Sequence, residues 1–198
     1  MTNNKATRLF LLRHGPTAAP AGSFVGSSDL PLSGQGLSRL EDILPQLKTV
    51  TYWYCSPMLR TRQTLERLRH CACSAGGPVY DERLREIDFG RWELRSFADI
   101  AEKEQECLTA WNQYLDFVFP EGEAVAAFIA RVEAVLTMFG ESEHDAVGVV
   151  THGGVIRTMI CLALGISPRN YLLFDVQPAS LTILDLFSEG GVLRGLNL

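Results

Sequence analysis

Two histidines in this chain stand where an imidazole could act as a nucleophile. His14 follows the apolar residues 9–12 and Arg13, and His152 follows the apolar run 147–151. Each histidine precedes a glycine, so each apolar run reads as a buried strand that ends and turns there. A histidine held by neighbouring backbone can attack phosphorus through a ring nitrogen, which predicts covalent catalysis.

Two arginines can supply a phosphate site around these histidines. Arg13 directly precedes His14, and Arg60 falls in the first turn of a helix that Ser56, as cap, and Pro57, as first residue, are expected to start. A planar guanidinium suits a phosphate dianion, and the free backbone amides of a helix start can bind the same anion. The spacing therefore predicts a phosphate pocket that needs no metal ion.

A leaving alkoxide needs a proton, and a carboxyl group can supply it. Glu86 comes just after the third expected strand, residues 79–84. A carboxyl group beside a bound dianion can keep its proton near neutral pH, because like charge disfavours its ionised form. Glu86 is therefore the expected general acid, while Asp88 and Glu93 remain alternatives on sequence alone.

The elements that must position these groups alternate between strand and helix. Both histidines are expected at carboxyl ends of parallel strands, the edge of an open α/β sheet where ligands bind. Strands are predicted over residues 8–12, 52–55, 79–84 and 146–151, with a final antiparallel hairpin of residues 180–187 and 192–196. Helices are predicted from about residue 33 to 47, then over residues 56–70, 96–119, 122–139 and 155–164. The sequence thus predicts an α/β fold: a single domain over residues 1–198, a three-layer α/β/α sandwich with a mostly parallel sheet.

Particular residues mark the expected ends of these helices. Ser33 suits an N-cap ahead of Leu37, and Pro45 is expected to kink or end that helix. Gly140 and Gly165 are expected just past the ends of two later helices, where glycine readily adopts a left-handed conformation.

The segment of residues 96–119 is expected to be helical but less regular. One helical face would hold Trp111, Tyr114, Leu115 and Val118, and Phe117 and Phe119 would lie off that face. Apolar surface on more than one side suits a helix that covers a pocket, so this segment is a candidate lid. Ordinary core packing explains the same pattern equally well.

The composition narrows the classes of partner and compartment. The chain has 198 residues, 46% hydrophobic and 21% charged, and a formal net charge of -5, which argues against nucleic acid or an anionic membrane as a partner. No apolar run approaches the roughly 20 residues of a membrane span. The five cysteines are odd in number and irregularly spaced, which suits a reducing compartment, so a cytoplasmic protein is expected. His70, Cys71 and Cys73 lack a second pair of ligands, so no metal site is expected.

Four sequence blocks carry a resemblance to the histidine phosphatase superfamily. They are residues 12–17, 56–64, 84–93 and 151–157, in the family's order. The resemblance implies a phosphoglycerate mutase-like fold and no cofactor. It also implies that His14 is the phosphorylated nucleophile and Glu86 the proton donor. The phosphate-binding residues that it implies are Arg13, Arg60, His152 and Gly153.

Within this superfamily the chain most resembles the α-ribazole-5′-phosphate phosphatases of cobalamin biosynthesis. Residues 25–32, 120–123 and the tail 179–197 carry that likeness. It implies a metal-independent hydrolase that acts on a small phosphomonoester. A broad-specificity phosphatase, a phosphoglycerate mutase-type enzyme and a catalytically dead phosphate-binding or scaffold protein remain the alternatives. The oligomeric state, including a homodimer, is left open.

Overall fold

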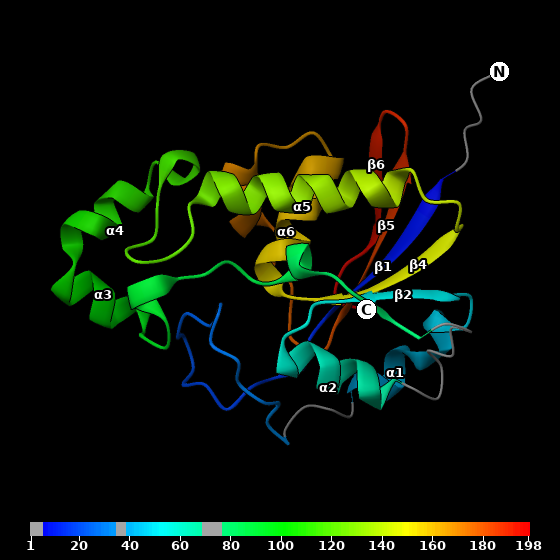
Figure 1. The fold of residues 1–198 in the computed structure, drawn as a ribbon, viewed down its shortest axis with the longest axis horizontal. Coiled ribbons are helices and arrows are strands. Elements are labelled where there is room, and N and C mark those ends of the chain that lie inside the picture. Colours follow the sequence, from blue (N-terminus) through cyan, green and yellow to red (C-terminus); the bar gives the residue numbers. More distant parts are fainter. Residues whose placement is uncertain (1–5, 35–38, 69–76) are drawn as a thin grey trace.

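A mixed sheet organises the structure, a computed structural model that describes residues 6–34, 39–68 and 77–198. Within these residues the sheet has six strands in the order β3-β2-β4-β1-β5-β6 (Figure 1). The strands are β1 (Thr7–Arg13), β2 (Tyr52–Cys55), β3 (Val79–Tyr80), β4 (Ala146–Thr151), β5 (Leu181–Phe187) and β6 (Gly190–Gly195). The first four run parallel, and β5 and β6 form an antiparallel hairpin beside β1. The expected mostly parallel sheet with a C-terminal hairpin is confirmed.

Helices cover both faces of this sheet, as Figure 1 shows. On one face lie α1 (Arg39–Ile43), the 3-10 helix η1 (Leu44–Leu47) and α2 (Leu59–Arg67), and on the other α5 (Val125–Gly140) and α6 (Gly153–Ala163). Successive residues of β1 point to opposite faces: Leu9 and Leu11 pack in the core under α5 and α6, while Phe10 and Leu12 pack in the core with α1. The three-layer α/β/α sandwich is therefore confirmed.

The region of residues 79–84 is shorter as a strand than expected. β3 ends at Tyr80, and the 3-10 helix η2 (Glu82–Leu84) follows at once. The carboxylate of Asp81 accepts a hydrogen bond from the backbone N–H of Arg83 at 2.9 Å and so caps this turn. The N–H of Asp81 still donates to Cys55 of β2 at 3.0 Å, and the turn that its side chain caps ends the strand there.

Two expected helix ends are wrong, and two are confirmed. α2 begins at Leu59 after an extended Met58, so Ser56 is not its cap. α5 runs through Gly140, which is not the residue past its end. Gly165 has φ of 66° just after α6 and closes that helix as expected. Pro45 lies in η1, where α1 has already ended.

The segment of residues 96–119 is not one helix. It forms α3 (Phe97–Lys103), α4 (Gln105–Trp111), the 3-10 helix η4 (Tyr114–Asp116) and an extended stretch. Glu104 breaks the first two at φ of −137°, and Tyr114 has φ of 40°. The chain therefore turns, so the expected helical face is broken: Tyr114 is buried while Leu115 and Val118 are exposed, and Phe117 and Phe119 are buried.

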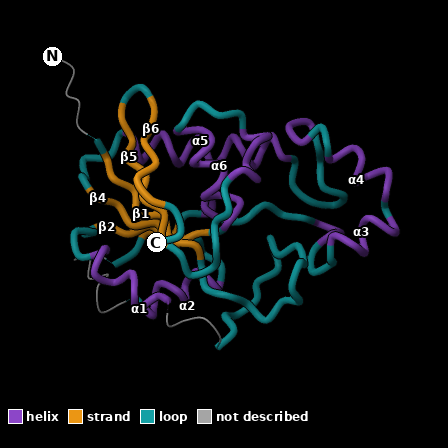
Figure 2. The backbone as a smooth tube through the Cα atoms, turned by 180° about the vertical axis from the view of Figure 1, so that it is seen from behind, coloured by secondary structure: helices purple, strands orange, loops and turns teal. Residues whose placement is uncertain are grey.

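Both views place α3 and α4 at one end of the molecule, away from the β5–β6 hairpin (Figures 1 and 2). The loop of residues 15–34 lies beside α3, where Ser23 pairs with Ser96 and Phe24 pairs with Glu93. The loop and the α3–α4 segment therefore meet over the strand ends that carry the histidines.

Some sequence predictions fall outside the described residues. These concern Leu37, His70, Cys71 and Cys73. The first helix is described only from Arg39 onward, so its expected start at Ser33 stays a prediction. Among residues 6–34, 39–68 and 77–198, no helix is long and apolar enough to cross a bilayer.

Replacing Gly148 of β4 by alanine is expected to destabilise the fold. A Cβ at Gly148 would lie 2.5 Å from a ring carbon of Trp53, itself fully buried on β2. Forcing a methyl group into a packed core costs about 1–3 kcal/mol of the free energy of unfolding. Chemical denaturation measures this change. Gly140→Ala is the matched control: its new methyl meets no neighbouring atom within 4 Å, so unfolding should become no easier.

Candidate active site

The two strand-end histidines meet at one edge of the sheet. β1 and β4 are parallel neighbours whose last residues, Arg13 and Thr151, are paired, so the next residue of each strand is a histidine at the same level. The rings of His14 and His152 lie 5.1 Å apart between centroids, at 62°. The sequence prediction that the two imidazoles share a site is confirmed.

The ring of His14 is held with one nitrogen free. Its Nδ1 lies 2.7 Å from the carbonyl oxygen of Gly15. A carbonyl can only accept, so Nδ1 carries the proton and Nε2 keeps its lone pair. Burial, with the positive charges of Arg60 and Arg13, holds the pKa of His14 well below its usual range. His14 is therefore a neutral imidazole with a nucleophilic Nε2 at neutral pH.

His152 has both ring nitrogens engaged by protein groups. The Nε–H of Arg60 donates to its Nδ1 at 3.2 Å, so its Nε2–H donates to the hydroxyl of Ser56 at 2.8 Å. The Ser56 hydroxyl thus binds His152 and does not cap α2. Burial is the largest cause that lowers the pKa of His152, and Arg60 adds to it. In this arrangement His152 has no free N–H for a phosphate, so its expected contact with one stays a prediction.

Arg60 is fully buried and holds the loop of residues 26–28 against the site. Its guanidinium donates to the carbonyl oxygens of Gly26 at 2.7 Å and Ser28 at 2.8 Å. Burial lowers its pKa, an effect that Glu86 partly opposes. Arg60 is therefore a cation beside the histidines, and its hydrogen bonds also hold this loop in place.

Arg13 offers a second, less tied guanidinium. Its Nη1 donates to the carbonyl oxygen of Val176 at 2.5 Å, and its buried Nε has no hydrogen-bond partner within the described chain. Burial and the neighbouring charge of Arg157 lower the pKa of Arg13 to about 10, so it remains a cation at neutral pH. Unused donors on a charged, desolvated group favour an anionic ligand here.

The three candidate acids have distinct surroundings. The Glu93 carboxylate accepts backbone N–H bonds from residues 26, 27, 28 and 89, and it lies under the same loop that Arg60 holds from the other side. Asp88 accepts from the hydroxyl of Ser27 and the N–H of Gly90. Glu86 instead lines the same cavity as His14. Of the three, Glu86 is the one that shares this cavity with His14.

Two glycines at the start of α6 allow this close arrangement. The N–H of Gly154 donates to the Glu86 carboxylate at 2.8 Å, and a Cβ at Gly154 would overlap that carboxylate. A Cβ at Gly153 would lie 3.2 Å from the guanidinium carbon of Arg13. The helix start thus fixes the acid and leaves room for the cation.

A cavity of about 600 Å³ joins these groups, and we call it the histidine cavity. Of the predicted site residues, Arg13, His14, Glu86 and Gly153 line it, and the fully buried Arg60 and His152 lie beside His14. Its remaining wall is largely apolar and aromatic, including Phe24, Phe89, Trp111, Tyr114, Phe119 and Tyr171. The cavity therefore combines cationic groups with aromatic surface that suits a flat, apolar group.

Arg157, Tyr114 and Tyr171 line the cavity although none of them belongs to the predicted set of site residues. The sequence suggests a solvated or structural charge for Arg157, and here it donates to the carbonyl oxygen of Phe174 at 2.8 Å. Its position one helical turn after Gly153 is the signal that could have placed it. Tyr114 and Tyr171 stack at 4.7 Å between ring centroids, and burial raises both pKa values, so both phenols stay neutral. No sequence pattern pairs these two tyrosines.

The lowered pKa values of the buried histidines can be measured directly. An NMR titration should find the Cε1 resonances of His14 and His152 changing well below pH 6.5, because burial and nearby arginines disfavour the charged rings. The same resonances in the urea-unfolded chain, titrating near 6.5, provide the reference. Because the unfolded chain binds these protons first, stability should fall as pH drops below about 6.5. A midpoint near 6.5 in the folded protein would contradict the assigned surroundings.

The fold and this constellation define an α/β enzyme with a neutral histidine and arginines at a cavity that suits a small anionic ligand. The sequence model of the histidine phosphatase superfamily (branch 1) matches residues 9–198, and the chain belongs to this family. It is therefore a phosphatase with the phosphoglycerate mutase-like fold.

Named relatives span nearly the whole chain. The adenosylcobalamin/alpha-ribazole phosphatase of Escherichia coli K12 is 29% identical over 195 residues, which cover 96% of this chain and 95% of that protein. The protein named "Probable phosphoglycerate mutase GpmB" from Proteus mirabilis is 30% identical over 169 residues, 80% of this chain and 75% of that one. Among solved structures, the alpha-ribazole phosphatase from Shigella flexneri has a TM-score of 0.84 at 26% identity, covering 97% of this chain and 96% of that chain.

Proposed function

We propose that this phosphatase hydrolyses small phosphomonoesters, without a metal ion, through a phosphohistidine on Nε2 of His14. The observation that carries the proposal is the hydrogen bond from Nδ1–H of His14 to the Gly15 carbonyl at 2.7 Å. It leaves the lone pair of Nε2 beside the guanidinium of Arg13 and the carboxyl of Glu86 in one cavity. These are the nucleophile, the charge stabiliser and the acid that phosphoryl transfer requires.

The reaction has two balanced steps. In the first, Nε2 of His14 bonds to phosphorus, the bond from phosphorus to the ester oxygen breaks, and Glu86 gives its proton to the leaving alkoxide. In the second, Glu86 takes a proton from water, whose oxygen bonds to phosphorus while the N–P bond breaks. Inorganic phosphate leaves and both residues regain their starting states.

The cations stabilise the charge that develops on the transferred group. Arg13 has a buried Nε without a partner in the described chain, and the N-terminus of α6 begins at Gly153 on the cavity wall. A dianion bound there also favours a new partner for His152, whose ring would then exchange its bond to Arg60 or to Ser56 for one to phosphate.

We assign the substrate as α-ribazole 5′-phosphate, an intermediate of cobalamin biosynthesis. Two observations support this choice: the relatives named above, and the aromatic residues that line the same cavity as Arg13 and His14. The flat base of α-ribazole can stack on rings such as Phe24 and Trp111, which lie 5.7 Å apart between centroids.

Steady-state hydrolysis of a substrate panel in EDTA tests the assignment. The panel holds α-ribazole 5′-phosphate, ribose 5-phosphate, 3-phosphoglycerate and p-nitrophenyl phosphate. We expect kcat/KM for α-ribazole 5′-phosphate to exceed that for ribose 5-phosphate by at least about 100-fold, because the two share the reacting group and differ in the stacking base. Equal values would withdraw the substrate and leave a broad-specificity phosphatase.

Isomerisation of 3-phosphoglycerate without release of phosphate would instead indicate a mutase. Phosphate binding without turnover of any ester would indicate a dead site.

A further inference from the structure

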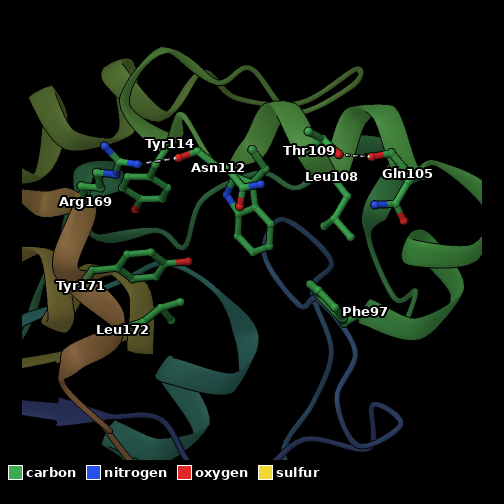
Figure 3. A pocket seen from close by; sticks show the side chains of 10 residues that line it. Phe97, Gln105, Leu108, Thr109, Asn112, Tyr114, Arg169, Tyr171 and Leu172 are labelled. Carbon is green, nitrogen blue, oxygen red and sulfur yellow. Dashed lines mark hydrogen bonds between the residues drawn. The ribbon is translucent and has the colours of Figure 1, made fainter.

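A second cavity of about 520 Å³ lies next to the histidine cavity, and we call it the side cavity. Figure 3 shows its two walls: Phe97, Gln105, Leu108 and Thr109 come from α3 and α4, and Arg169, Tyr171 and Leu172 come from the 3-10 helix η5 (Pro168–Leu173). The two walls face each other across open space. The hydrolytic groups His14, Glu86 and Arg13 line the histidine cavity and not this one.

The two cavities share one wall. Trp111, Tyr114, Tyr171 and Leu172 line both of them. Tyr114 and Tyr171 stack on each other in this wall, and Leu172 beside them is 67% exposed. A ligand longer than the histidine cavity therefore has a route to the side cavity past the exposed Leu172, beside the buried Tyr114.

The lining of the side cavity selects a type of chemical group. Among the described residues that line it there is no carboxylate, and Arg169 is its cation. The guanidinium of Arg169 spends one N–H on the carbonyl oxygen of Asn112 at 3.2 Å, so its other donors remain for a ligand. The amides of Gln105 and Asn112 add further donors. An uncharged or anionic group that carries carbonyl oxygens fits this lining, and a cation does not.

Apolar side chains are exposed at this cavity in a way that favours a flat ligand. Phe97 is 52% exposed and Leu172 is 67% exposed, and they stand on opposite walls. Large apolar groups gathered around a concave surface commonly mark a ligand site. The occupant is thus expected to be a flat ring system whose faces contact these apolar groups and whose edge accepts hydrogen bonds.

We propose that the side cavity is a second subsite that binds the distal part of an extended alcohol, so that this phosphatase also hydrolyses long phosphomonoesters ending in a flat, carbonyl-bearing ring system. The proposal rests on the proposed function, because the ester bond is cleaved in the histidine cavity. The substrate bridges the shared wall over Leu172.

Flavin mononucleotide is the probe, because its phosphate ends a flexible chain that carries a flat ring with carbonyl oxygens. Thr109→Trp is designed to fill the side cavity from the exposed face of α4, far in sequence from the groups that bind phosphate. We expect kcat/KM for flavin mononucleotide to fall on the order of 10-fold, mainly through KM, while hydrolysis of the short p-nitrophenyl phosphate changes less than about twofold. Equal losses on both esters, or no loss on either, would overturn the subsite.

The neighbouring Ala110 supplies the matched control. It is exposed on the same helix but does not line the cavity, so Ala110→Trp adds the same ring and should change neither ester. Arg169→Gln removes the cation without filling the space, and should raise KM for the flavin ester alone.

Binding measured without turnover separates this proposal from the proposed function. In the His14→Ala background, fluorescence anisotropy of flavin mononucleotide reports its Kd, and adding Thr109→Trp should weaken binding on the order of 10-fold. If chains that keep His14 hydrolysed no ester but this binding difference were found, the hydrolytic function would be refuted and the subsite kept. If they hydrolysed esters but binding did not differ, the subsite would be refuted and the hydrolytic function kept.

Discussion

His14→Ala is expected to lower kcat/KM for every phosphomonoester by at least about 10⁴-fold, because among the described residues that line the histidine cavity His14 alone offers an imidazole lone pair on which the N–P bond can form. Burial and the charges of Arg60 and Arg13 keep His14 neutral, and the Gly15 carbonyl fixes the proton on Nδ1, so the lone pair of Nε2 is available. Turnover of p-nitrophenyl phosphate and of an alkyl ester measures the loss.

The control for this substitution is His144→Ala. His144 is exposed and stacks on Tyr52 at 4.2 Å between ring centroids, away from the cavity lining, so its loss should leave kcat/KM unchanged. Rapid acid-free quenching with labelled substrate should trap an acid-labile phosphoryl group on the wild type and none on His14→Ala. Retained turnover in the variant would refute the phosphohistidine.

Glu86→Gln is expected to lower kcat/KM by an amount that depends on the leaving group of the substrate. For an alkyl phosphate kcat/KM should fall about 10²–10⁴-fold, because the leaving alkoxide then lacks its proton. For p-nitrophenyl phosphate the loss should stay below about 10-fold, since nitrophenolate leaves without protonation. The ratio kcat/KM is the right measure, because it covers steps up to release of the alcohol and excludes the later hydrolysis.

Glu93→Gln is the matched comparison for Glu86. Its carboxylate accepts hydrogen bonds from backbone amides of residues 26–28 and does not line the cavity. Its loss should therefore lower kcat/KM for both esters alike, through the loop to which Arg60 is also hydrogen-bonded. If Glu86→Gln also lowered kcat/KM equally for the alkyl ester and for p-nitrophenyl phosphate, Glu86 would not be the general acid.

The sequence alone could predict that His14 and His152 lie close together, because the end of a strand can be read from the local sequence. An apolar run that stops at His14 or His152 fixes where each strand ends, and parallel pairing of β1 and β4 does the rest. The sequence could not decide which of Glu86, Asp88 and Glu93 is the general acid. These residues have the same chemistry within eight positions, and what separates them is a contact with a loop some 60 residues earlier.

The errors in the fold also come from contacts distant in sequence. Ser56 has the chemistry of a helix cap, yet its hydroxyl bonds to His152, 96 residues away. The helical spacing of Tyr114 and Val118 fails because Tyr114 takes φ of 40°, stacked on Tyr171 of η5. Tertiary contacts outweigh a local preference of this size, which is usually below about 1 kcal/mol per residue.

The cations and the aromatic rings at the histidine cavity belong to different parts of the chain, and this division has an evolutionary consequence. Arg13, Arg60 and Arg157 come from β1, α2 and α6, which pack on or within the sheet, whereas Trp111 and Phe119 come from the segment of residues 96–119 at one end of the molecule. Ile100, Phe117 and Phe119 of this segment pack in the same core as β1, so they are tied to the fold that carries the reaction. Its exposed residues are not, so selectivity is free to drift at those positions while the chemistry stays inherited, and a designer who randomises them has the same freedom.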